Sequence, residues 1–224
     1  MIPIAKLRMK ISFIIDNPDS WFHDYASILI PVLKKYDRSP RYLKNGSEIK
    51  KGDILFILSC DKLLKKEELS RHKNNIVVHA ADLPRDRGWS PLTWQVERGK
   101  NKITVTLFEA SADVDAGKYY LKDKIELNGT ELIDEIREKQ AKRTIKMIKE
   151  YLSRYPMKAK PQRGRPSHNR KRRPEDYRLD LNKSIASQFN KMRVADNERY
   201  PLYFIRGGVK YILKVYKDKK KQKI

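Results

Sequence analysis

Short apolar runs alternate with amphipathic segments along the first two thirds of the chain. Residues 9–16 (MKISFIID) alternate apolar and polar positions and are rich in β-branched residues, so they predict a strand. Residues 52–60 and 74–80 are nearly continuous apolar runs, which are typical of strands buried on both faces of a parallel sheet. The runs over 103–110 and 118–127 predict a further pair of strands.

Helical spacing of apolar residues fills the intervals between these strands. Residues 20–36 predict a helix that its internal proline should kink or shorten, and residues 65–73 predict a short polar helix. Residues 90–100 open with a serine and a proline, which are favoured at an N-cap and at the first helical position. A long amphipathic helix follows over 129–155. Strands that alternate with helices in this way predict an α/β fold with a mainly parallel sheet.

The composition changes at the end of the long helix. Residues 156–179 hold four prolines, few apolar residues and many arginines, which indicates a linker or an arm draped over the domain. A short helix over 181–194 precedes two aromatic-rich runs about Gly207–Gly208 that predict a β-hairpin. We therefore expect a domain over 1–155 and a basic extension over 156–224. Because a lone hairpin is marginal in water, this one should pack on the domain or on a second subunit.

The chain is strongly basic, with 51 Lys and Arg against 28 Asp and Glu among 224 residues and a net charge of +23. From residue 156 onward, 21 residues are basic and 6 are acidic. Such an excess suits nucleic acid, phosphates or an anionic membrane surface, and the bland alternative is a solvated, lysine-rich end over 217–224.

Compartment follows from what the sequence lacks. The single cysteine, Cys60, allows no disulfide within the chain, and the first ten residues lack the apolar run of a signal peptide. No window approaches the roughly 18 consecutive apolar residues that a membrane span requires. We therefore expect a cytoplasmic protein without a membrane span.

Two residues are candidates for proton chemistry. His79 stands where the strand 74–80 ends, and the carboxyl ends of parallel strands are where ligands bind in such sheets. Its imidazole can act as a general base near neutral pH, although a satisfied histidine at a strand end is an equal alternative. Asp115 lies in a DAG turn and is either a plain turn residue or a carboxylate that orients His79. Cys60 follows a buried run and is interpreted as packing, and no metal, dinucleotide or Walker spacing is present.

The run from residue 79 to 127 resembles the formyltransferases that take a one-carbon unit from N10-formyltetrahydrofolate, and the resemblance extends over most of 9–155. More weakly, RRPEDYRLDLNKSI (172–185) is similar to a downstream stretch of these enzymes. The resemblance implies a Rossmann-like formyltransferase fold with a short C-terminal extension. It is carried by His79, Ala81, Leu83–Pro84, Gly88, Pro91, Trp94, Thr104–Thr106 and Asp115–Gly117.

The family normally uses an Asn-His-Asp trio, of which His79 and Asp115 carry over. The position of the asparagine, two residues before the histidine, is Val77 here. Asn75 is the first candidate to replace it, but it lies about 13 Å along the strand from His79 at roughly 3.3 Å per residue. The implied reaction is acyl transfer, in which His79 takes a proton from the attacking amine or stabilises the oxyanion, and Asp115 assists it.

The resemblance also implies binding residues. The pterin of the folate would be held by the backbone around Leu58, Ser59 and Cys60 and by the loop with Ala81, Leu83 and Pro84, where the apolar side chain of Leu83 suits a flat ring. The acceptor would meet Trp89 and Trp21, with Arg85 and Arg87 as donors to a diphosphate, although loop packing and solvated arginines are equal alternatives.

The favoured function is transfer of a formyl group to a nucleotide-linked amino sugar (dTDP-, UDP- or GDP-linked) for surface glycans such as the O-antigen of lipopolysaccharide, by a homodimer joined through the hairpin. One alternative is a methionyl-tRNA formyltransferase-like enzyme, against which the short extension counts because the family's tRNA enzymes carry a full C-terminal domain. Another is a non-catalytic nucleic-acid-binding protein that uses 163–174, a stretch without aromatic residues for base stacking. Nucleic acid is therefore not expected as a partner.

Overall fold

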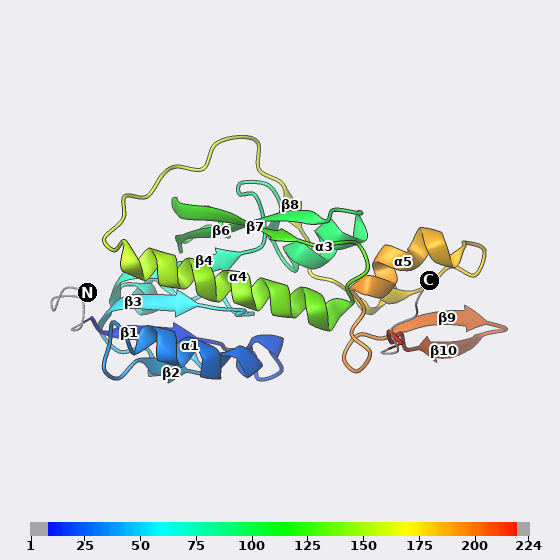
Figure 1. Cartoon of the computed structure of the whole chain (residues 1–224), viewed down its shortest axis with the longest axis horizontal. Coiled ribbons are helices and arrows are strands. Elements are labelled where there is room, and N and C mark those ends of the chain that lie inside the picture. The colour runs from blue at the N-terminus through cyan, green and yellow to red at the C-terminus, as the bar shows by residue number, and fades with distance from the viewer. Residues whose placement is uncertain (1–8, 219–224) are drawn as a thin grey trace.

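Six strands form one sheet in the order β2-β1-β3-β4-β6-β7 (Figure 1). The structure is a computed structural model and describes residues 9–218. The first four strands in this order run parallel, whereas β6 is antiparallel to β4 and to β7, so the predicted mainly parallel sheet is confirmed. The strand bounds are β1 (Ile11–Ile14), β2 (Arg41–Leu43), β3 (Gly52–Ile57), β4 (His72–His79), β6 (Lys102–Glu109) and β7 (Tyr119–Glu126).

The main core lies between the sheet and two helices, α1 (Ala26–Leu33) and α4 (Ile133–Ser153). Figure 1 shows α4 running along the sheet with α1 beside it. The strands contribute Phe13 and Phe56, and the helices contribute Leu29, Ile148 and Tyr151, all of them fully buried. Each such side chain contributes about 1.5–3 kcal/mol relative to an exposed position. This core fixes the sheet, and with it the carboxyl ends of β1, β3 and β4.

Some helices differ from the sequence expectation. The helix predicted over 20–36 is divided into a 3₁₀ turn, η2 (Trp21–Tyr25), and α1, which contains the proline. The helix predicted over 65–73 is a single turn, α2 (Lys66–Leu69), because β4 already pairs with β3 from its first residue. Ser90 precedes α3 (Pro91–Glu97) as expected, but its φ is 47° and its side chain makes no capping bond. A second short 3₁₀ turn is η3 (Gly46–Glu48).

The chain after α4 crosses back over the domain before it forms its own small core. Lys160 exchanges backbone hydrogen bonds with Tyr119 of β7, and β8 (His168–Asn169) pairs with β5 (Arg87–Gly88). The extension then contains η4 (Pro174–Tyr177), α5 (Ile185–Arg193) and the hairpin of β9 (Leu202–Arg206) and β10 (Val209–Leu213). Its own apolar cluster consists of Tyr177, Leu179, Met192, Ala195 and Leu202.

The predicted hairpin is confirmed, and its turn explains the two glycines. Gly207 and Gly208 have φ of 57° and 77°, in the left-handed region that a two-residue hairpin turn requires. Most of the lysine-rich end over 217–224 lies outside the described residues. Within residues 9–218, no helix has the length and hydropathy needed to cross a membrane.

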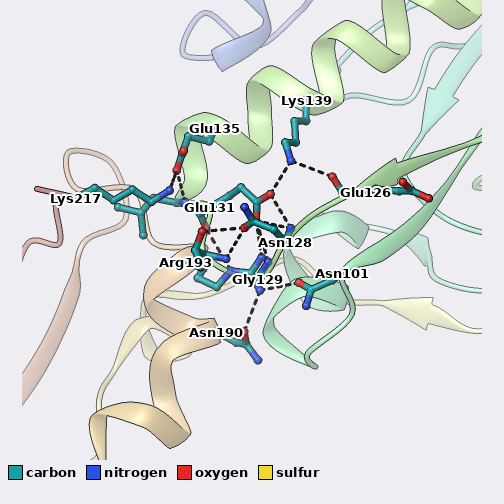
Figure 2. A network of polar contacts seen from close by, with 12 residues as sticks. Asn101, Glu126, Asn128, Gly129, Glu131, Glu135, Lys139, Asn190, Arg193 and Lys217 are labelled. Carbon is teal, nitrogen blue, oxygen red and sulfur yellow. Dashed lines mark hydrogen bonds and ion pairs between the residues drawn. The ribbon is translucent and has the colours of Figure 1, made fainter. Parts of the chain in front are cut away.

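A buried ion pair fastens the extension to the domain (Figure 2). Arg193 of α5 is fully buried, and its Nη2 lies 3.3 Å from Oε2 of Glu131, which precedes α4. Its Nη1 donates to Asn101 and Asn190, each at 3.0 Å. Burial alone would raise the pKa of Glu131, but hydrogen bonds from Lys139 and from backbone N–H groups lower this pKa to about 2. The network therefore holds two desolvated charges whose separation would be costly.

Candidate active site

His79 and Asp115 form a dyad at the carboxyl edge of the sheet. His79 is the last residue of β4, and Asp115 lies in the loop between β6 and β7. Nε2 of His79 is 3.4 Å from Oδ2 of Asp115, and the two side chains are only 12% and 14% exposed. The carbonyl oxygen of Asp86 lies 3.2 Å from the same nitrogen, and Phe108 meets the ring edge-on. Because both polar neighbours of Nε2 are acceptors, this nitrogen carries a hydrogen.

The Asp115 loop is held in a conformation that few residues adopt. Asp115 has a φ of 51°, in the left-handed region. The backbone N–H of Gly88 donates to its Oδ2 at 2.7 Å, which fixes the carboxylate. A side chain at Gly117 would place its Cβ 1.7 Å from the carbonyl oxygen of Glu109. The DAG spacing thus has a physical reason, because glycine alone allows the loop to close against β6.

The arm over residues 156–179 makes contacts with the site that sequence reasoning missed. Gln162 donates through Nε2 to the carbonyls of Asp115 and Gly117, both at 2.8 Å. Its Oε1 accepts from Arg87 at 2.8 Å, so one amide joins both loops of the site. Ser167 accepts from the backbone N–H of Asp86 at 2.9 Å. The arm therefore contacts the two segments, at Asp86 and at Asp115, that place acceptors at Nε2 of His79.

The structure does not bring Asn75 to His79. Its amide nitrogen donates to the carbonyl of Leu69 at 2.9 Å, at the junction of α2 and β4. Its Oδ1 is buried without a hydrogen-bond partner among residues 9–218. The pairing of β4 with β3 is regular through this region, so no bend carries Asn75 towards the strand end. Val77, at the family's asparagine position, packs instead in the apolar cluster of Phe108.

Of the three residues expected at the folate after β3, Ser59 presents the most open surface. It is exposed, has a φ of 52°, and its hydroxyl accepts from that of Ser20 at 2.8 Å. Leu58 is buried. Cys60 donates to the carbonyl of Ile14, and burial raises the pKa of its thiol to about 12. The thiol is therefore protonated at neutral pH, which supports its interpretation as a packing residue.

The second predicted folate segment, Ala81 to Pro84, is turned into the domain. Ala81 and Leu83 are buried and pack against Phe108, so Leu83 does not present its side chain to a flat ring as we expected. The carbonyl of Ala81 accepts from Thr106 at 2.6 Å, and that of Leu83 accepts from Lys122 at 2.9 Å. The apolar side chains of this segment are therefore not open to a pterin, whereas the strand end at Ser59 offers exposed surface.

The predicted acceptor residues have different environments. Trp21 packs on Phe22 and Tyr25 within the core and is half-buried. Arg87 is engaged by the arm, whereas Arg85 is exposed. Trp89 is 36% exposed beside the dyad loop. Of the four, Trp89 and Arg85 offer exposed surface to an acceptor.

Residues 9–152 match the family described as Formyl transferase, and the chain belongs to this family. A methionyl-tRNA formyltransferase from Thermosipho melanesiensis is 32% identical over 167 residues, which cover 75% of this chain and 54% of that protein. The chain thus spans about half the length of this curated relative.

Solved structures share the fold. A sugar N-formyltransferase from a Shewanella species has a TM-score of 0.66 at 12% identity and covers 95% of this chain and 99% of that one. HypX from Aquifex aeolicus, in complex with tetrahydrofolic acid, has a TM-score of 0.74 at 19% identity and covers 92% of this chain and 37% of that one. At these identities the likeness establishes the fold.

Proposed function

We propose that this protein transfers a formyl group from N10-formyltetrahydrofolate to the amine of a nucleotide-linked amino sugar used in surface glycan synthesis. The observation that carries the proposal is the His79–Asp115 pair, 3.4 Å apart at the carboxyl edge of a formyl transferase fold. We further propose residues 1–155 as the catalytic domain and 156–224 as an extension that completes its site.

The folate supplies the activated formyl carbon, and residues of the chain carry out the proton transfer. The new bond joins the sugar nitrogen to the formyl carbon, the bond from that carbon to N10 breaks, and one proton must pass from the amine to N10. His79 takes and returns this proton at Nδ1, because its Nε2 already carries a hydrogen. Asp115 stabilises the imidazolium and keeps the ring in place, since its own carboxylate is fixed by the Gly88 N–H.

Charge that develops on the formyl oxygen needs a donor, and Val77 supplies none. The amide of Asn75 is occupied elsewhere, so the imidazolium of His79 is the side-chain donor at the carboxyl end of β4. Loss of one such donor costs on the order of 10²–10³ in rate in other enzymes. We therefore expect slower turnover than in members of the family that retain the asparagine.

The choice of an amino sugar is supported by the overall likeness in fold. The Shewanella sugar N-formyltransferase is matched over nearly the whole of both chains, extension included. A second acceptor, the amine of methionyl-tRNA, is favoured by a different observation, the 32% identity to the Thermosipho enzyme. The basic extension would suit a polyphosphate backbone.

A panel of acceptors separates the two candidates. The protein is incubated with N10-formyltetrahydrofolate and with UDP-, dTDP- or GDP-linked amino sugars, or with charged initiator tRNA, and the product is detected by mass. A formylated sugar nucleotide is the expected result. A product on the tRNA alone would transfer the assignment to the second candidate.

We also propose a homodimer through the hairpin. Every residue of β10 is exposed, including Val209, Tyr211, Ile212 and Leu213. A two-stranded sheet with one apolar strand open to water is marginal by itself, and a second copy would cover it.

A further inference from the structure

Lys171 contacts two loops beside the candidate site. Its Nζ lies 4.5 Å from the ring centroid of Trp89 and 3.5 Å from Oδ2 of Asp61. The Lys171 side chain is 63% exposed, so its ammonium reaches solvent between these two partners. We propose that Lys171 and Trp89 form the binding site for the diphosphate of the acceptor nucleotide, and that Asp61 occupies Lys171 until this anion arrives. The inference rests on the proposed function.

The partners of Lys171 come from the loops that surround the dyad. Trp89 directly follows Gly88, whose N–H binds the carboxylate of Asp115. Asp61 follows β3, and its backbone N–H donates to Asp16 at the end of β1 at 2.7 Å. Lys171 therefore links segments that leave β1, β3 and β4, three neighbouring parallel strands, at the edge where such sheets bind ligands.

The neighbours of Lys171 hold it in this position. Arg170 and Arg172 both lie over the ring of Trp94, at 5.0 and 4.4 Å from its centroid. Arg170 also pairs with a carboxylate of the extension at 2.5 Å, and Arg172 pairs with a carboxylate of α3 at 2.6 Å. The two arginines are thus occupied on α3 and within the extension. Of these three cations, only Lys171 contacts Trp89 and the loop that follows β3.

The chemistry of this position favours an incoming anion. An ammonium is a compact point charge with three donors, and it binds phosphate oxygens well. Its present partner is an exposed carboxylate, and exposed ion pairs of this kind contribute little to stability. A diphosphate carries more charge than one carboxylate, so it can displace Asp61.

Anionic oxygens could also come from the glutamyl carboxylates of the folate. Those carboxylates are separated from the formyl nitrogen by the benzoyl group. The diphosphate, in contrast, is attached to the same sugar ring that bears the reacting amine. Because Trp89 follows the residue that holds Asp115, the position beside the dyad favours the diphosphate.

The test measures binding without turnover. Tryptophan fluorescence is titrated with UDP, dTDP or pyrophosphate, and tetrahydrofolate is titrated separately. Lys171→Met should weaken the binding of the three phosphates about tenfold, the loss of one charge-assisted contact. Asp61→Asn should tighten it, because the competing carboxylate is gone. Trp89→Phe should abolish the fluorescence change.

Lys210→Met is the matched control, because its ammonium lies 4.1 Å from the centroid of Tyr203 in the hairpin, away from the site. It should leave all affinities unchanged. Unchanged affinity for the phosphates in Lys171→Met, weaker binding by Asp61→Asn, or a loss confined to tetrahydrofolate would each overturn the inference. Phosphate binding that follows the expected order while no sugar is formylated would count against the proposed function alone.

Discussion

The side chain of Gln162 holds the main chain of Asp115, 47 residues earlier in the sequence, through a 2.8 Å hydrogen bond to its carbonyl. Asp115 needs such support because its left-handed backbone is strained for a residue with a side chain. The same amide accepts from Arg87, so the arm sets the distance between the two loops of the site. The extension therefore contacts the candidate site as well as completing the fold.

Gln162→Ala should lower kcat about 10- to 100-fold with little change in KM, because it displaces the carboxylate and not the substrate contacts. Gln162→Glu keeps an acceptor for Arg87 but loses both donations to the Asp115 loop, so it should be impaired to a similar degree. Gln188→Ala is the control, since the hydrogen-bond partners of Gln188 among residues 9–218 all lie in the extension. Steady-state kinetics decide the matter, and an unimpaired Gln162→Glu would show that the donations are not needed.

Asp115→Asn isolates the charge of the carboxylate. Asparagine tolerates the left-handed backbone, and its Oδ1 can still accept from Gly88. We expect turnover to fall by roughly 10²-fold or more, within the range that general acid–base groups contribute. Asp113→Asn, an exposed position in the same loop, should have no effect. Wild-type rates in Asp115→Asn would remove the carboxylate from the mechanism.

Strand ends and the turn motif made His79 and Asp115 candidates, and the family resemblance paired them, but neither could locate the residues that support them. His79 was predictable because an apolar run ends there, and Asp115 because the DAG turn follows the next strand. Gln162 carries no such signal, since its contacts are made by one side-chain amide across a proline-rich arm. Lys171 is equally hidden, because in the sequence it is one cation in the run RKRR. The structure distinguishes Lys171 from the arginines on either side of it, because those arginines pack on Trp94 and Lys171 does not.

The strand pattern also has a limit along its own axis. Alternation places Asn75 and His79 on one face of β4, but the rise of the strand over four residues separates them along its axis. β2 escaped prediction because three residues are too few for a period to show. The hairpin was predictable for the opposite reason, since two glycines between alternating runs specify the turn.

Arg193→Met should destabilise the protein by about 3 kcal/mol, because it removes the fully buried partner of Glu131 and leaves only the half-exposed Lys139 to pair with this carboxylate. The double variant Arg193→Met with Glu131→Gln should recover part of this loss. Urea unfolding at neutral pH measures both. Arg154→Met, which breaks an exposed pair with Glu150, should cost less than about 1 kcal/mol. Equal losses at the two arginines would contradict the role given to the buried pair.

Acid should weaken the fold through Glu131. Its pKa is lowered from 4.5 to about 2, so its contribution is complete above pH 4.5 and is lost as the pH falls towards 2. The shift corresponds to an order of 3 kcal/mol. The unfolding free energy of the wild type should therefore fall more steeply over this range than that of Glu131→Gln. Asp123 and Asp196, whose pKa values are also lowered, add a background of the same sign to both. Parallel curves would show that Glu131 titrates normally.

Val209→Glu should convert the proposed dimer into a monomer. Val209 is 53% exposed on β10, so a charge there leaves the fold of one chain intact but cannot be buried against a second copy without a partner. Light scattering at micromolar concentration should give the mass of two chains for the wild type and of one for the variant. Leu181→Glu is the matched control, because Leu181 is 55% exposed in the extension but outside the hairpin. A wild type that is already monomeric at this concentration would remove the hairpin from any account of assembly.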